Sequence, residues 1–343
     1  MAPVLCDRCA GRATRRARVG LNTGTLREFP ATTLLVGINV AVFIGMVLTG
    51  GFGGGLNFST SQAIQWGGNA SPLTLSGDYW RLVTAGFVHG GLLHIAFNMW
   101  CLWSLGQLSE RLFGSWITFA VYILTGVGGS LLSTAVHPLQ TEVGASGAIF
   151  GIAGAIISGV KFGNVSVGPG QRRAIMSSMV FFVGINLFLG AAIPGIDNMC
   201  HLGGLVSGLI FGVPLATASA SGKKSFEWAT IALAALVLAG IGVQVVKARA
   251  PEAQSAMRSD IVRTAQHYLN LGDYERAIEL LQDASSAAPH DPVIQALLGF
   301  AYEKNNQTDK AIAAYHRALQ LKPDFIEVQK QLEKLQSSAP ADK

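Results

Sequence analysis

The chain has 343 residues, of which 50% are hydrophobic and 13% are charged, with 25 Lys and Arg against 20 Asp and Glu. A soluble domain carries roughly 25% charged residues, and the deficit is concentrated in residues 31–247, which hold eight cations and five anions. This composition excludes a single water-soluble globule and predicts a polytopic membrane domain followed by a smaller soluble region. The net charge of +5 does not indicate a nucleic-acid partner, because six cations precede the first apolar stretch, where basic residues mark the cytoplasmic side of a membrane.

The first 30 residues form a basic segment that we expect to be cytoplasmic. Cys6 and Cys9 within it have the spacing of half a zinc ribbon. A structural zinc site takes four ligands as a rule, and no second Cys pair or His occurs before His89. We therefore interpret the pair as a vestigial or truncated finger and predict no cofactor. Zinc shared between two chains is the alternative.

Seven apolar stretches are long enough to cross a hydrocarbon layer, which takes about 17–25 helical residues. They are residues 31–49, 91–109, 115–136, 145–162, 175–193, 199–217 and 229–247. The links on one side carry six cations and those on the other carry only Arg81, which places the amino terminus inside. Lys247 and Arg249 are exceptions to this asymmetry. Seven spans then place the carboxyl-terminal tail on the extracytoplasmic side.

The tail contains an internal repeat with a period of 34 residues. Three residues of the first copy return in the second: Ala277, Ala284 and Pro289 recur as Ala311, Ala318 and Pro323. This period, with small residues where two helices cross, is typical of tetratricopeptide (TPR) repeats. We predict two repeats and a capping helix over residues 259–337, a small α-solenoid. An unrelated pair of helical hairpins is the alternative.

Polar residues in the second span lie on one helix face. His94 and Asn98 are four residues apart, so one lies above the other, and His89 stands at the entrance of the span. Ionisable groups inside a membrane are costly and usually functional. Hydrogen bonding between helices explains this pair equally well on its own.

Two further spans open with small residues around a polar one. The fourth begins Gly144-Ala-Ser146-Gly147, where the glycines leave backbone N–H groups free near a helix start, which favours negative charge. The sixth begins with His201, followed by Gly204-x3-Gly208, a face that lets another helix approach closely. Helix packing alone explains each motif taken by itself.

The combination of these residues points to chemistry. All of these spans start from the outer side, so Ser146, His201, His94 and Asn98 are expected at similar depth. A nucleophilic serine needs a base within hydrogen-bond reach and donors for the oxyanion, and these residues supply both. Glu110 belongs to the inner end of its span, so we expect a Ser–His dyad without the third member of a triad.

In order and spacing, these motifs resemble those of the rhomboid intramembrane serine proteases. Further motifs add to the resemblance: Trp80-Arg81 in the first outer link and Glu110-Arg111 at an inner end. The similarity covers about residues 31–217, with 229–247 as an appended seventh helix. It implies an open-topped bundle of six helices with a water-filled cavity facing outward.

The resemblance also implies roles for the motif residues. Ser146 would attack a peptide bond in or near a transmembrane segment of a protein substrate, and His201 would act as general base and then as acid. His94, Asn98 and the backbone N–H of Ser146 would hold the oxyanion. The chain departs from the family at Phe150, where many members have a tyrosine. Its ring can stack on His201 but cannot donate a hydrogen bond, so we expect activity with a less firmly oriented histidine.

Three classes of function follow. The first is an active intramembrane endopeptidase, whose TPR tail recruits substrates or partner proteins. The second is a catalytically silent rhomboid-like protein that binds and escorts membrane helices, which the intact dyad disfavours. The third is a small-solute transporter, which is disfavoured because the polar residues cluster at outer ends, with Asn39 and Asn186 as exceptions. The implied partners are transmembrane proteins and the lipid bilayer, and the implied location is a bacterial inner membrane.

Overall fold

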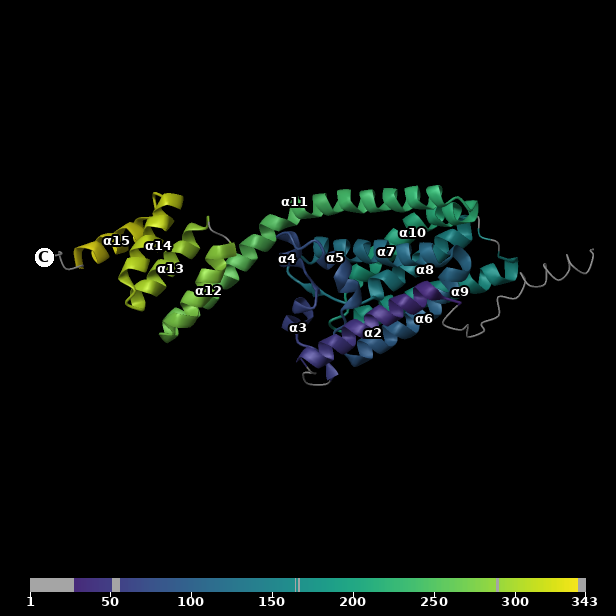
Figure 1. Cartoon of the computed structure of the whole chain (residues 1–343), viewed down its shortest axis with the longest axis horizontal. Helices are drawn as coiled ribbons and strands as arrows, with labels where there is room; N and C mark the ends of the chain where they lie inside the picture. Colours follow the sequence, from purple (N-terminus) through teal and green to yellow (C-terminus); the bar gives the residue numbers. More distant parts are fainter. Residues whose placement is uncertain (1–27, 51–55, 164, 166, 288–289, 339–343) are drawn as a thin grey trace, which may run out of the picture. The chain divides into compact units, whose positions relative to one another are not determined.

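The computed structural model describes residues 28–50, 56–163, 165, 167–287 and 290–338. The described residues are mainly helical, with two short strands, β1 (Asn69–Ala70) and β2 (Thr141–Glu142), paired antiparallel. The expected all-α fold is therefore confirmed. The chain divides into two compact units, Met1–Arg249 and Ala250–Lys343 (Figure 1). Cys6, Cys9 and almost all of the basic segment 1–30 lie outside the described residues.

The second unit begins within a long helix, α11 (Lys224–Leu271). Four helices follow in the described part of the tail: α12 (Tyr274–Ala287), α13 (Pro292–Lys304), α14 (Thr308–Leu321) and α15 (Ile326–Ser338). Sequence analysis ends the seventh span at residue 247 and begins the repeats at residue 259. Both limits fall inside the continuous helix α11, which also contains Pro251.

Small residues of the repeat lie where its helices pack. The alanines at equivalent positions of the two copies are buried: Ala277, Ala284, Ala311 and Ala318. A Cβ added to Gly299 would lie 2.6 Å from the Tyr315 ring, so only a residue without a side chain allows this approach. The turns between paired helices contain Gly272 at φ +75° and Asn306 at φ +56°, a conformation that these residue types adopt readily. The predicted helical TPR region is therefore present.

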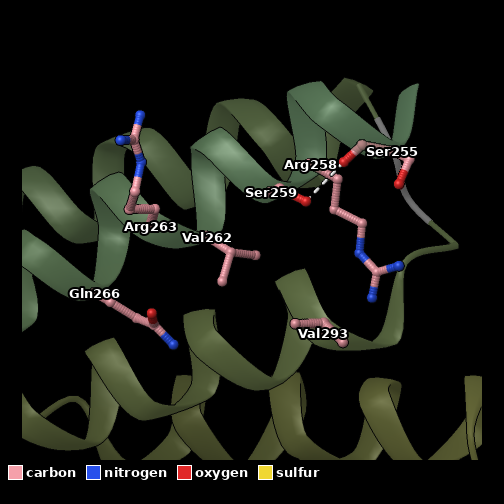
Figure 2. Close-up of a pocket in the computed structure, with 7 residues that line it drawn as sticks. All are labelled: Ser255, Arg258, Ser259, Val262, Arg263, Gln266 and Val293. Atoms are coloured by element: carbon pink, nitrogen blue, oxygen red, sulfur yellow. Dashed lines mark hydrogen bonds between the residues drawn. The ribbon is translucent and has the colours of Figure 1, made fainter. Parts of the chain in front are cut away.

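A groove of about 310 Å³ lies in the second unit, between α11 and α13. Figure 2 shows polar side chains of α11 above Val293 of α13, including Arg258 and Gln266. Arg258 forms an ion pair of 2.8 Å with Asp291, which caps the start of α13. Arg263 pairs with Asp260 one turn earlier on α11. The groove is therefore polar, with both guanidinium groups balanced by carboxylates.

The first unit contains a helix at each of the seven expected spans, but four of these helices begin or end four to six residues beyond the expected limits. They are α2 (Pro30–Gly50), α6 (Leu92–Phe113), α7 (Ser115–Val136), α8 (Ser146–Phe162), α9 (Pro169–Ala192), α10 (Asn198–Ser221) and the first part of α11. Five described helices are long and apolar enough to cross a membrane: α2, α7, α9, α10 and α11. Helix α8 is apolar but has only 17 residues, and α6 contains the polar residues His94, Asn98 and Glu110.

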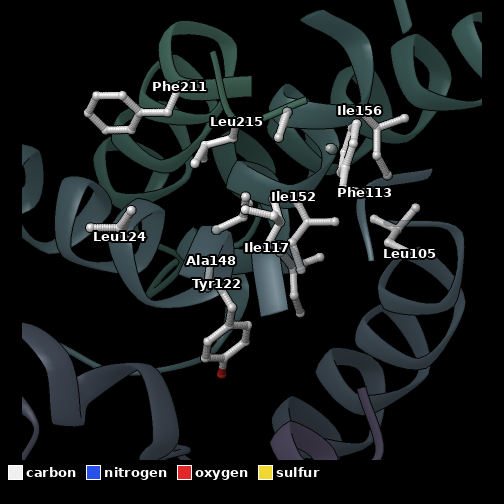
Figure 3. Close-up of a cluster of buried hydrophobic side chains, with 14 of the residues drawn as sticks. Leu105, Phe113, Ile117, Tyr122, Leu124, Ala148, Ile152, Ile156, Phe211 and Leu215 are labelled. Carbon is white, nitrogen blue, oxygen red and sulfur yellow. The ribbon is translucent and has the colours of Figure 1, made fainter. Parts of the chain in front are cut away.

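Helix α8 lies in the middle of the first unit's core. Figure 3 shows its residues Ile152 and Ile156 among side chains of α6, α7 and α10, and both isoleucines are 0% exposed. Helix α9, in contrast, exposes large apolar residues such as Phe181 and Phe188, as expected of a face toward lipid. The enclosure of α8 fixes the position of Ser146 at its first turn.

Helices α8 and α10 touch backbone to backbone. A Cβ on Gly204 would collide with the carbonyl oxygen of Gly147, and a Cβ on Gly208 would collide with that of Gly151. In a membrane, such close packing drives helix association because apolar burial contributes little between lipid-facing surfaces. The glycine pair of α10 thus brings its first turn, with His201, against the first turn of α8.

The first outer link folds into short helices: α3 (Thr60–Gln65), α4 (Ser71–Leu75), α5 (Arg81–Thr84) and the single turn η2 (Ala85–Phe87). Buried Arg81 ties this link together. Its guanidinium donates to the carbonyls of Ile64 at 2.7 Å and Gly68 at 3.1 Å, pairs with Asp78 at 2.9 Å and lies over the Trp80 ring. The Trp80-Arg81 motif therefore supports the fold of the link.

Glu110 joins the last turn of α6 to the first turn of α2. Its carboxylate accepts from the backbone N–H groups of Thr32 at 2.6 Å and Ala31 at 3.3 Å. A negative charge there complements the free N–H groups and the dipole of the helix start. Arg111 lies over the Phe29 ring beside it. Glu110, at the end of α6, therefore caps the start of α2.

Candidate active site

Ser146 and His201 meet at the starts of two helices. Ser146 opens α8 and His201 lies in the first turn of α10. The Ser146 Oγ and the His201 Nε2 are 2.9 Å apart, a hydrogen bond. Ser146 is half-buried, whereas His201 is only 7% exposed. This arrangement places a serine hydroxyl and an imidazole within hydrogen-bond reach, as a nucleophilic serine and its base require.

Phe150 stacks on the His201 ring, whereas the nearby Asp197 carboxylate does not bond to it. The Phe150 ring stacks on the imidazole with centroids 4.4 Å apart and planes 8° from parallel. The His201 Nδ1 is buried and has no hydrogen-bond partner among the described residues. The Asp197 carboxylate instead accepts from the backbone N–H groups of Met199 and Cys200 and from Ser133. Among the described residues, Ser146 is thus the hydrogen-bond partner of the His201 ring, and no carboxylate bonds to its Nδ1.

His94 presents a donor toward the turn before Ser146. Its Nδ1 accepts from the backbone N–H of Gly90 at 3.3 Å, which assigns the proton of a neutral imidazole to Nε2. A Cβ on Gly144 would lie 2.7 Å from this Nε2. Gly144 has φ +123°, so both its backbone conformation and its contact with the ring favour glycine.

Asn98 and His89 complete this side of the site. The Asn98 amide donates to the His94 carbonyl at 3.0 Å, which leaves its second N–H available. His89 is fully buried, and its Nε2 accepts from the backbone N–H of Ala145 at 3.5 Å. Its ring meets that of His94 edge to face, with centroids 5.1 Å apart. His89 therefore supports both His94 and the turn that leads to Ser146.

Sequence analysis missed one polar cluster beside these residues. Glu142 is only 5% exposed and accepts hydrogen bonds from Asn69, Ser130 and Cys200. In the sequence, Glu142 lies just before the apolar stretch of residues 145–162 and Cys200 lies within that of residues 199–217, and no spacing connects the two. The signal in the sequence that could have revealed this cluster is a charged residue, Glu142, four positions before Ser146. Among the described residues, no group of three or more His, Cys, Asp or Glu side chains is arranged to hold a metal ion.

Comparison with known proteins agrees with this geometry. Residues 76–218 match the family model of the rhomboid domain. The chain contains a rhomboid domain. Residues 268–335 match the model of a tetratricopeptide repeat. The matched rhomboid segment begins in the first outer link and ends in α10, so it includes Ser146, His201, His94 and Asn98.

Relatives of this chain include a bacterial protein and two plant proteins. "Rhomboid protease GluP" of Bacillus subtilis is 28% identical over 294 residues, which cover 85% of this chain and 54% of that protein. "RHOMBOID-like protein 4" of Arabidopsis thaliana is 38% identical over 136 residues, covering 40% of this chain and 34% of its own. "RHOMBOID-like protein 6, mitochondrial", also of Arabidopsis thaliana, is 35% identical over 150 residues, covering 44% and 48%. The chain thus spans about half or less of each relative's length.

The rhomboid match and the apolar helices together identify a multi-pass integral membrane protein. The rhomboid and TPR assignments made from the sequence are confirmed. The roles of the individual site residues, the membrane in which the protein lies and the side on which each terminus lies stay predictions.

Proposed function

We propose that this rhomboid protein is an intramembrane serine endopeptidase that cleaves peptide bonds in or near transmembrane segments of membrane proteins. The observation that carries the proposal is the 2.9 Å contact between the Ser146 Oγ and the His201 Nε2. The name of the Bacillus subtilis relative, a rhomboid protease, supports the same activity.

In the proposed reaction, the Ser146 Oγ attacks the carbonyl carbon of the scissile bond while His201 Nε2 accepts the hydroxyl proton. The carbonyl oxygen becomes an oxyanion, for which His94, Asn98 and the Ser146 backbone N–H are the donors. Collapse of this intermediate breaks the C–N bond, and His201 returns the proton to the leaving amine. Water, deprotonated by His201, then hydrolyses the acyl-enzyme and regenerates Ser146.

The catalytically silent alternative is not favoured. A protein that only binds and escorts membrane helices has no need for a serine hydrogen-bonded to a histidine, or for a histidine stacked on Phe150. The transporter hypothesis requires polar residues along a full path. Asn39 instead pairs with the Tyr122 hydroxyl at 3.1 Å, and Asn186 donates to the backbone of its own helix at 2.8 Å.

An activity-based probe tests the proposal directly. We expect the detergent-solubilised protein to be labelled covalently by a fluorophosphonate, because a histidine-activated serine attacks the phosphorus, and Ser146→Ala to lose the label. Ser158→Ala is the matched control, since Ser158 lies on the same helix and bonds only to backbone carbonyls. Gel fluorescence and mass spectrometry of the labelled peptide measure the result. Equal labelling of wild type and Ser146→Ala would show that Ser146 is not the nucleophile.

We further propose that the protein lies in a bacterial inner membrane with its amino terminus in the cytoplasm and its TPR tail outside. The excess of cations on the inner links supports this orientation. Stacked helical repeats commonly bind other proteins along a concave face, and the groove between α11 and α13 offers one such surface. On the outer side, the tail would recruit substrates or partner proteins without taking part in the chemistry.

Thiol labelling in intact cells tests this orientation. A cysteine in place of Glu279, which is exposed on α12, should react with a membrane-impermeant reagent. A cysteine in place of Lys223, exposed on the link before α11, should react only after lysis, and the wild type gives the background of its native cysteines. The reverse pattern would place the tail inside and contradict recruitment at the outer side.

A further inference from the structure

A buried polar cluster lies beside the two proposed catalytic residues and is not explained by their chemistry. Glu142 on β2 precedes Ser146 by four residues, and Cys200 on α10 immediately precedes His201. We call these two residues, with Asn69 of β1 and Ser130 of α7, the Glu142 cluster. Its members come from four separate elements that meet only in the folded protein.

Three side chains of this cluster donate hydrogen bonds to the Glu142 carboxylate. The Cys200 thiol donates to Oε1 at 3.3 Å, while the Ser130 hydroxyl at 2.9 Å and the Asn69 amide at 3.2 Å donate to Oε2. The Asn69 amide is held in this orientation because its oxygen accepts from Thr74 at 2.7 Å. Three converging donors fit the ionised carboxylate, which only accepts.

Cys200 connects this carboxylate to both catalytic residues. A Cβ on Gly147, the residue after Ser146, would lie 2.6 Å from the Cys200 Sγ. The thiol thus rests against the first turn of α8, and its own backbone continues directly into His201. Any displacement of the Cys200 side chain therefore changes the spacing between the serine and the histidine.

Stability does not explain a carboxyl group at this position. Burial raises the pKa of Glu142 from 4.5 to about 7, against the opposing effect of its three hydrogen bonds. Because the folded pKa is above the unfolded one, the native state binds more protons than the unfolded state between these values. The free energy of unfolding therefore falls as pH rises from 4.5 to about 7. The ionised cluster costs folding stability at neutral pH.

We propose that Glu142 is a positioning residue, whose carboxylate holds the Cys200 thiol and thereby keeps His201 in register with Ser146. This inference rests on the proposed protease activity. Two titratable groups of α10 face Glu142, the Cys200 thiol and the Asp197 carboxylate. The side chains that α7 and β1 direct at it, those of Ser130 and Asn69, do not titrate.

A kinetic cycle tests this inference. Glu142→Gln, which has the same shape, and Cys200→Ala should each lower kcat about 10-fold, because a small misplacement of reacting groups has effects of this order or larger. KM should change less than about twofold, and the double variant should be no slower than either single one. Cys200→Ser keeps a donor for the carboxylate and should retain most of the wild-type kcat. Ser109→Ala removes a buried hydrogen bond between α6 and Thr118 of α7, away from the Glu142 cluster. This variant should leave kcat unchanged.

The pH dependence of kcat provides a second test, because a purely structural role of Glu142 would not change it. The ratio of wild-type kcat to that of Glu142→Gln should be about 10 above pH 8 and should approach one below pH 6, because the wild-type carboxyl is then protonated. Glu142→Gln should also unfold at a higher temperature than wild type at about pH 8.

The outcomes separate this inference from the proposed function. Absence of cleavage by the wild type would contradict the protease activity itself. Cleavage by the wild type with unchanged kcat in Glu142→Gln would overturn only the role of Glu142. Should Glu142→Gln fail to fold, equal kcat in Cys200→Ala and Cys200→Ser overturns it as well. If the losses in kcat multiplied in the double variant, Glu142 and Cys200 would act separately. This result would also overturn the role of Glu142.

Discussion

Ser146→Ala and His201→Ala should each abolish cleavage of a model transmembrane substrate, if the proposed protease activity holds. Each removes one partner of the 2.9 Å contact, so the expected loss in kcat is on the order of 10⁴ to 10⁶. The double variant is no slower than either single one, because the two residues act as a unit. Cleavage in proteoliposomes, followed by gel mobility of the product, measures this.

The fold should survive these changes, and thermal unfolding in detergent checks that it does. Ser158→Ala serves again as the control on α8 and should cleave at the wild-type rate. Wild-type turnover by Ser146→Ala would contradict the assignment of Ser146 and His201 as the catalytic pair. A loss in His201→Ala that is matched by a loss of folded protein would assign this histidine to packing.

His94→Ala and Asn98→Ala should each lower kcat by about 10² to 10³, which corresponds to roughly 2.7–4 kcal/mol of transition-state stabilisation per donor. The His94 Nε2 and the free Asn98 N–H lie beside the turn at Gly144, where the charge of the tetrahedral intermediate would develop. Because these bonds strengthen only as that charge forms, KM should change far less than kcat.

Steady-state kinetics with a fluorogenic transmembrane peptide separates the two parameters. Ser104→Ala is the control, because Ser104 also lies on α6 and also bonds the carbonyl one turn earlier. It should leave both parameters unchanged. If His94→Ala or Asn98→Ala raised KM at constant kcat, these residues would bind substrate and would not stabilise the oxyanion.

The helices of the first unit could be predicted from the sequence because apolar length and period are local signals. The 34-residue period of the tail is equally local, and Ala277 and Ala311 indeed lie in its buried positions. The contact between Ser146 and His201 bridges 55 residues. It was predictable because each residue begins a span, and the alternation of spans across the membrane places both beginnings on one side.

The Glu142 cluster could not be predicted in this way. Asn69 and Glu142 are 73 residues apart and meet through the register of β1 and β2, strands of two residues each that leave no periodic pattern. The continuity of α11 was missed for a different reason. The charged residues around Pro251 end the apolar stretch, but they do not end the helix, since backbone hydrogen bonding needs no apolar side chains.

The glycine contacts between α8 and α10 also determine when the reactive geometry is assembled. The carbonyl of Gly147 limits how closely Gly204 approaches, and main-chain atoms have no alternative rotamers. The spacing of the two backbones that carry Ser146 and His201 is therefore set during folding, and no backbone rearrangement is needed to bring these residues together when a substrate arrives. Under the proposed activity, the adaptation would fall to the substrate, whose helix would have to unwind to present an extended peptide bond. Selection among substrates would then depend on how easily a transmembrane helix opens near its end, as well as on the side chains around the bond.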